Sequence, residues 1–87
     1  MNKQEIKSAI RKWVLEKNGK IQSKDLRDDT PIIEQRIISS LQIMDLILFL
    51  EKLREEAIDV ENLKPGVFRT IDIIYNNFFK EMSHGKN

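Results

Sequence analysis

The amino-acid sequence predicts an all-α domain with three main helices. Apolar residues recur at helical spacing in three stretches, and the connections between these stretches contain proline or glycine. The length of 87 residues fits one domain, and 40% hydrophobic with 33% charged residues is typical of a globular protein. We therefore expect a single domain over residues 1–87, with its core at about 3–82 and a flexible tail at 83–87.

The composition excludes several classes of function. The chain has no cysteine, so it forms no disulfide, thiolate nucleophile or cysteine metal site. No apolar run reaches the roughly 20 residues that span a bilayer, and the first residues lack the pattern of a secretion signal. No metal-ligand spacing, glycine-rich phosphate loop or catalytic triad is evident. We expect a cytoplasmic protein that has no metal site and is not an enzyme.

The first helix is predicted from the N-terminus to Asn18, where Gly19 supplies a stop because glycine adopts the left-handed conformation easily. A long connection follows over about residues 19–38, with Pro31 interrupting any helix. Connections of this length often carry function. The apolar face of this helix comprises Ile6, Ala9, Ile10, Trp13 and Val14, and the residues expected to hold the connection on the core are Leu26, Ile32 and Ile33.

The second helix is predicted from Ser40 to about Glu56. Ser39 and Gln42 have the spacing of a capping box, with Ser39 as the cap. Phe49 is expected towards the polar side, and the helix has more apolar residues than one face needs, which is typical of a central helix or one with a partner. The predicted core face is Ile43, Leu46, Leu50 and Leu53, and the second apolar strip is Leu41, Met44 and Leu48.

A second connection is predicted over residues 57–69, with a turn at Pro65 and Gly66 and room for one short helix. Thr70 has the position of an N-cap for the third helix. The residues expected to be buried are Ile58, Val60, Leu63 and Phe68 in the connection, and Ile71, Ile74, Tyr75, Phe78, Phe79 and Met82 in the helix.

Charge is distributed unevenly along the chain although its net charge is only +1. Residues 1–27 hold eight Lys/Arg and three Asp/Glu, a net charge of +5, whereas residues 28–63 hold three Lys/Arg and nine Asp/Glu, a net charge of −6. Residues 64–87 carry +2. Partners respond to such local fields more than to the total, so we expect an acidic central surface and a basic first helix.

Three motifs resemble the acyl carrier protein family, including its aminoacyl and peptidyl carrier relatives. Residues 29–41 read Asp-Thr-Pro-Ile-Ile-Glu-Gln-Arg-Ile-Ile-Ser-Ser-Leu. The family has an Asp-Thr-Pro-Leu-like stretch, a glycine, two apolar residues and then Asp-Ser-Leu. Leu46, Leu50 and Glu51 match its Leu-x-x-x-Leu-Glu pattern, and residues 68–71 resemble the entry to its last helix. The resemblance covers about residues 5–80 and implies an acyl-carrier-like helical bundle.

The resemblance implies that Ser40 carries phosphopantetheine through a phosphodiester, and that the thiol of this arm holds an acyl or aminoacyl group as a thioester. A helix N-terminus independently favours an anion, by about 0.3–1 kcal/mol at an exposed site. The sequence departs from the family twice. Ser39 replaces the aspartate but can keep its capping role, and Arg36 replaces the glycine. Arg36 is either a clasp for the phosphate or a solvated loop residue, and a left-handed conformation there would be strained.

The strip of Leu41, Met44 and Leu48 has two interpretations that the sequence leaves open: core packing, or a surface on which partner enzymes dock. In the docking interpretation, which the resemblance favours, three acidic residues steer basic partners: Asp45, Glu51 and Glu55. Six further residues are expected in the core, where helices that part could admit an acyl chain. These are Leu46, Leu50, Ile58, Phe68, Ile71 and Ile74.

The resemblance implies a monomeric carrier for fatty acid, polyketide or related biosynthesis. Its partners would be a phosphopantetheinyl transferase, an acyl- or aminoacyl-loading ligase and synthase enzymes. The alternatives are an unmodified helical interaction module of the same fold or a small nucleic-acid binder. The last is disfavoured because Glu5 and Glu16 interrupt the basic face of the first helix. That basic face consists of Lys3, Lys7, Arg11, Lys12 and Lys17.

Overall fold

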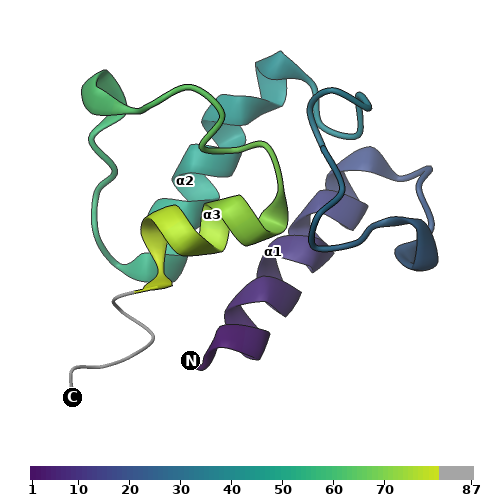
Figure 1. The fold of residues 1–87 in the computed structure, drawn as a ribbon, viewed down its shortest axis with the longest axis horizontal. Helices are drawn as coiled ribbons and strands as arrows, with labels where there is room; N and C mark the ends of the chain where they lie inside the picture. Colours follow the sequence, from purple (N-terminus) through teal and green to yellow (C-terminus); the bar gives the residue numbers. More distant parts are fainter. Residues whose placement is uncertain (81–87) are drawn as a thin grey trace.

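The computed structural model describes residues 1–80, and the regular secondary structure of this part is all helical, as predicted, with no strand. Three α-helices are joined by two long connections that contain short 3-10 turns (Figure 1). Within these residues, no helix is long and apolar enough to cross a membrane. The elements are α1 (Lys3–Asn18), η1 (Ser23–Asp25), η2 (Ser40–Gln42), α2 (Ile43–Arg54), η3 (Val60–Asn62) and α3 (Ile71–Phe78).

Both ends of α1 are capped by the side chains and backbone that flank it. The Asn2 side chain accepts a hydrogen bond from the Glu5 N–H, and the Glu5 carboxylate accepts one from the Asn2 N–H, each at 2.9 Å. At the other end, Gly19 is left-handed (φ 74°) and donates its N–H to the Leu15 carbonyl. The predicted stop at Asn18 and Gly19 is therefore confirmed.

The run from Ser40 to Arg54 differs from the predicted second helix at both ends. Its first turn is the 3-10 turn η2, and α2 begins only at Ile43. At the other end, α2 stops at Arg54 because Glu55 is left-handed (φ 61°), so the predicted extension to Glu56 is wrong. Ser39 is the N-cap of the run, as predicted.

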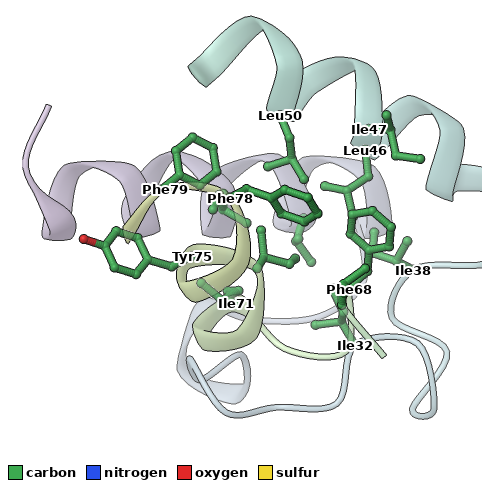
Figure 2. Close-up of a cluster of buried hydrophobic side chains, with 14 of the residues drawn as sticks. Ile32, Ile38, Leu46, Ile47, Leu50, Phe68, Ile71, Tyr75, Phe78 and Phe79 are labelled. Atoms are coloured by element: carbon green, nitrogen blue, oxygen red, sulfur yellow. The ribbon is translucent and has the colours of Figure 1, made fainter. Parts of the chain in front are cut away.

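The core lies between α2, α3 and α1, with buried residues of both connections closing it (Figure 2). Leu46 and Leu50 of α2 point towards α3, and both are fully buried. Phe68, just before α3, stacks on Phe78 with ring centroids 5.5 Å apart. Burying an aliphatic or aromatic side chain of this size contributes about 1.5–3 kcal/mol.

The second connection is buried at only some of the predicted positions. Ile58 and Phe68 are buried, Leu63 is partly buried, and the predicted short helix is the 3-10 turn η3. Val60 is 49% exposed, so its predicted burial is wrong. It begins η3, a single turn in which all three residues are exposed. A single turn is too short to form a continuous apolar face that could pack against the core.

The third helix begins as predicted, with the Thr70 hydroxyl accepting from the Ile73 N–H at 3.0 Å. Ile71, Ile74 and Tyr75 are buried, and Phe79 is buried just beyond the end of α3. Met82 and the predicted tail at 83–87 lie outside the described residues.

A charged cluster links α1 to the first connection and to α3. The Lys7 ammonium binds Asp72 of α3 and lies 3.7 Å from the Asp28 carboxylate, and Arg11 binds both Asp28 and the Leu26 carbonyl. The Asp72 N–H in turn donates to the Asp28 carbonyl at 2.9 Å. Only 11% of the Lys7 side chain is exposed. The hydrogen bond to Asp72, aided by the two carboxylate charges, raises the pKa of Lys7 above 10.5.

The raised pKa makes a pH-dependent contribution to stability. Lys7 should stabilise the fold fully below pH 10.5, its unfolded value, and lose this contribution as pH rises through the higher folded pKa. We expect Lys7→Met to lower the free energy of unfolding by about 1 kcal/mol at neutral pH, since the cluster is partly solvated. Urea unfolding of both proteins should show this difference shrinking above pH 10.5. A difference that grows there would contradict the assignment.

Candidate functional site

Ser40 is exposed at the junction between the first connection and the helical run of α2. It is the first residue of η2, and the preceding Ile37 and Ile38 are buried, which anchors the chain just before it. Within residues 1–80, the Ser40 hydroxyl has no hydrogen-bond partner. Ser40 therefore presents a free nucleophilic oxygen on a fixed backbone.

The cap at Ser39 leaves two backbone donors available beside this hydroxyl. The Ser39 N–H donates to the Gln42 side-chain oxygen at 3.0 Å, and the Gln42 N–H donates to the Ser39 carbonyl. The N–H groups of Ser40 and Leu41 have no acceptor among the described residues. Such unpaired donors at a helix start favour an anion, and a phosphodiester on Ser40 would meet this requirement.

Arg36 adopts the left-handed conformation, with φ 60°. Its N–H closes a turn by donating to the Ile33 carbonyl at 2.9 Å, and its side chain is exposed. A residue with a Cβ atom pays about 1–2 kcal/mol for this conformation, which a glycine avoids. The strain considered for an arginine at this position is therefore present.

The second apolar strip of α2 lies on the surface. Leu41 is 90% exposed, Met44 60% and Leu48 56%, so the alternative that these residues pack in the core is wrong. They follow Ser40 along the same helical run, and Asp45 is exposed among them. Exposed apolar residues grouped in this way are typical of an interaction surface.

The two glutamates of the candidate docking surface have different environments. Glu51 is partly buried, and its carboxylate accepts the Ile58 N–H at 2.8 Å, so it also fixes the start of the second connection. Glu55 is exposed at the left-handed end of α2. Of the pair, Glu55 is the one whose charge is free to steer a partner.

An open groove at this end of α2 involves residues that the sequence did not single out as functional. Trp13 of α1 stacks on Phe49 of α2, with ring centroids 5.6 Å apart, and Phe49 lines the groove together with Asp45 and Lys52, on the polar side where it was expected. Lys17 lies over the Trp13 ring, and Leu48 continues the exposed strip into the groove. The remaining lining residues are mostly charged: Asp45, Glu51, Lys52, Glu55, Glu56 and Ala57. The signal in the sequence for this contact was an aromatic residue in each of the two predicted helices, Trp13 and Phe49.

The six residues expected to form an acyl pocket are brought together in the core. None is more than 8% exposed, and Phe68 is held by its stack on Phe78 (Figure 2). Phe68 also lines a surface groove of about 310 Å³ with Ile33 and Leu63. The six are Leu46, Leu50, Ile58, Phe68, Ile71 and Ile74.

The basic face of α1 is partly neutralised within the protein. Lys7 and Arg11 bind the carboxylates of Asp28 and Asp72, and Lys3 lies over the Tyr75 ring. Two of the five cations considered for nucleic-acid binding are thus held in ion pairs, which reduces the positive field that phosphates would meet.

Comparison with protein-family models, with curated proteins and with solved structures gives no match to this chain.

Proposed function

We propose that this protein is a non-catalytic carrier that bears phosphopantetheine on Ser40. The observation that carries the proposal is the exposed, unpartnered Ser40 hydroxyl at the first turn of the α2 run, after a long anchored connection. Its place in the chain agrees with the resemblance of residues 29–41 to acyl carrier proteins, and the all-helical fold is compatible with an acyl-carrier-like bundle.

The residues at the start of the helical run from Ser40 to Arg54 fit a phosphopantetheine group. Attachment requires that Ser40 Oγ attack the pantetheine-bearing phosphorus of coenzyme A, which forms the phosphodiester and releases adenosine 3′,5′-bisphosphate. The hydroxyl proton passes to a base of the transferase. The unpaired N–H groups of Ser40 and Leu41 can then donate to the phosphate, and the positive end of the helix dipole stabilises it. When attached, the arm supplies a thiol that holds acyl or aminoacyl groups as thioesters.

Partners would dock beside this arm on the exposed strip of Leu41, Met44 and Leu48, with Asp45 and Glu55 attracting basic residues. These partners are a phosphopantetheinyl transferase, a loading ligase and synthase enzymes, and we expect the carrier to be a monomer. The same strip also supports a second candidate, an interaction module of the same fold that is never modified. Modification of Ser40 separates the two.

Intact-mass measurement tests the proposal. Incubation with coenzyme A and a phosphopantetheinyl transferase of broad specificity should add the mass of one phosphopantetheinyl group. The gain should be absent in Ser40→Ala, because the attacking oxygen is removed. It should persist in Ser39→Ala, which removes the hydroxyl of the adjacent serine, a residue that is also exposed. A wild-type protein that gains no mass with several transferases would leave the unmodified module as the better description.

A further inference from the structure

Arg36 combines a strained backbone with a side chain that makes no polar contact among the described residues. It is left-handed at φ 60°, a conformation that side chains with a Cβ atom rarely adopt. Its guanidinium is exposed and makes no ion pair or hydrogen bond within residues 1–80. A strained backbone conformation persists only where the surrounding structure holds it, and such conformations cluster at functional positions.

The backbone around Arg36 is held firmly. The Ile38 N–H donates to the Ile32 carbonyl at 2.9 Å, which closes the loop, and the Ile32 N–H donates to the Arg69 carbonyl. Ile32 and Ile38 are both fully buried. The loop therefore fixes where the Arg36 side chain starts, and only its outer part is free to move.

No acidic side chain of the loop competes for this guanidinium. Glu34 is already paired with Arg69 at 3.0 Å. The other two cations of residues 28–63 lie at the far part of α2, where Arg54 pairs with Glu56 and Lys52 lines the groove beside Trp13. Arg36 is thus the cation of this acidic region that lies close in sequence to Ser40.

We propose that Arg36 binds the phosphodiester attached to Ser40 and so serves as a phosphate clasp. Ser40 lies four positions after Arg36, which limits their Cα atoms to a separation of about 14 Å. The planar guanidinium offers paired donors that match two phosphate oxygens. It complements the unpaired N–H groups of Ser40 and Leu41. This inference rests on the proposed function, because it needs the arm in place.

The difference in thermal stability between the unmodified and modified protein tests the clasp. Attachment should raise the wild-type Tm by about 2–6 °C at low salt, because a new contact forms in the folded state only. In Arg36→Gln the rise should fall by at least half, and high salt should reduce the wild-type rise in the same way. The side-chain Nε–H resonance of Arg36 should also shift when the wild-type protein is modified.

Arg27→Gln is the matched control, since Arg27 is an exposed arginine of the same connection, and it should keep the full rise. An equal rise in the wild type and Arg36→Gln, or no rise in either, overturns the clasp even when both proteins gain the expected mass. A slower transfer reaction in Arg36→Gln with an unchanged rise also overturns it, because Arg36 would then act on the transferase. Absence of any mass gain in the wild type instead rejects the proposed function, and the clasp with it.

Discussion

Leu50→Ala is expected to lower the free energy of unfolding by about 2–5 kcal/mol. Leu50 is fully buried on α2 and points towards Phe78 of α3, so alanine leaves a cavity at the contact between the two helices (Figure 2). Domains of this kind have a total stability of only about 5–15 kcal/mol. Urea unfolding followed by helical circular dichroism measures the loss directly.

Leu48→Ala is the matched control, because it makes the same substitution two residues away on the same helix. Leu48 is 56% exposed, so its truncation should change stability by no more than about 0.5 kcal/mol. Equal losses at the two positions would contradict the placement of Leu50 inside and Leu48 outside. A small effect of Leu48→Ala would also show that this residue of the exposed strip is not needed for folding. The docking experiment with Met44→Arg depends on such independence between the strip and the fold.

Met44→Arg should slow loading by a partner enzyme at least tenfold and leave the fold intact. Met44 is 60% exposed at the middle of the strip, so arginine costs little in the free protein. In a complex, the arginine would bury a charge against the partner and repel its basic residues. A loss of about 1.4 kcal/mol in the contact corresponds to the tenfold change. The measurement is kcat/KM for modification by the transferase that loads the wild type.

Val60→Arg is the control for this substitution. Val60 is a similarly exposed apolar residue, but it lies in η3 of the second connection, away from the strip in sequence. Its loading kinetics should match those of the wild type. If both variants load normally, partners dock elsewhere, whereas slow loading of both would indicate a general effect of added positive charge.

The helices of this protein could be predicted from the sequence because their signals are local. Gly19 ends α1 through its own conformational freedom, and Thr70 begins α3 through a hydroxyl that reaches the Ile73 N–H. Periodicity also separated Leu46 and Leu50, which are buried, from the second strip. The end of α2 could not be predicted, since Glu55 is not a residue that favours the left-handed conformation.

Features that depend on distant contacts could not be predicted. Phe49 stacks on Trp13, which lies 36 positions earlier in the chain. The pairing of Lys7 with Asp28 and Asp72 joins three separate segments, and no spacing rule gives it. The candidate site was predictable as far as Ser40 and its cap. The exposure of the strip needed the structure, because apolar spacing alone fits core and docking surface equally.

The stack of Trp13 on Phe49 gives this protein an optical reporter of its own. Trp13 is the single tryptophan of the chain, and its ring lines the groove that Leu48 and Glu55 also border. The emission of an indole depends on the polarity and charge around it, and here Lys17 lies over the ring. A partner that binds in this groove changes the environment of the Trp13 ring. Its arrival can therefore be followed by intrinsic fluorescence, in unlabelled protein and in real time.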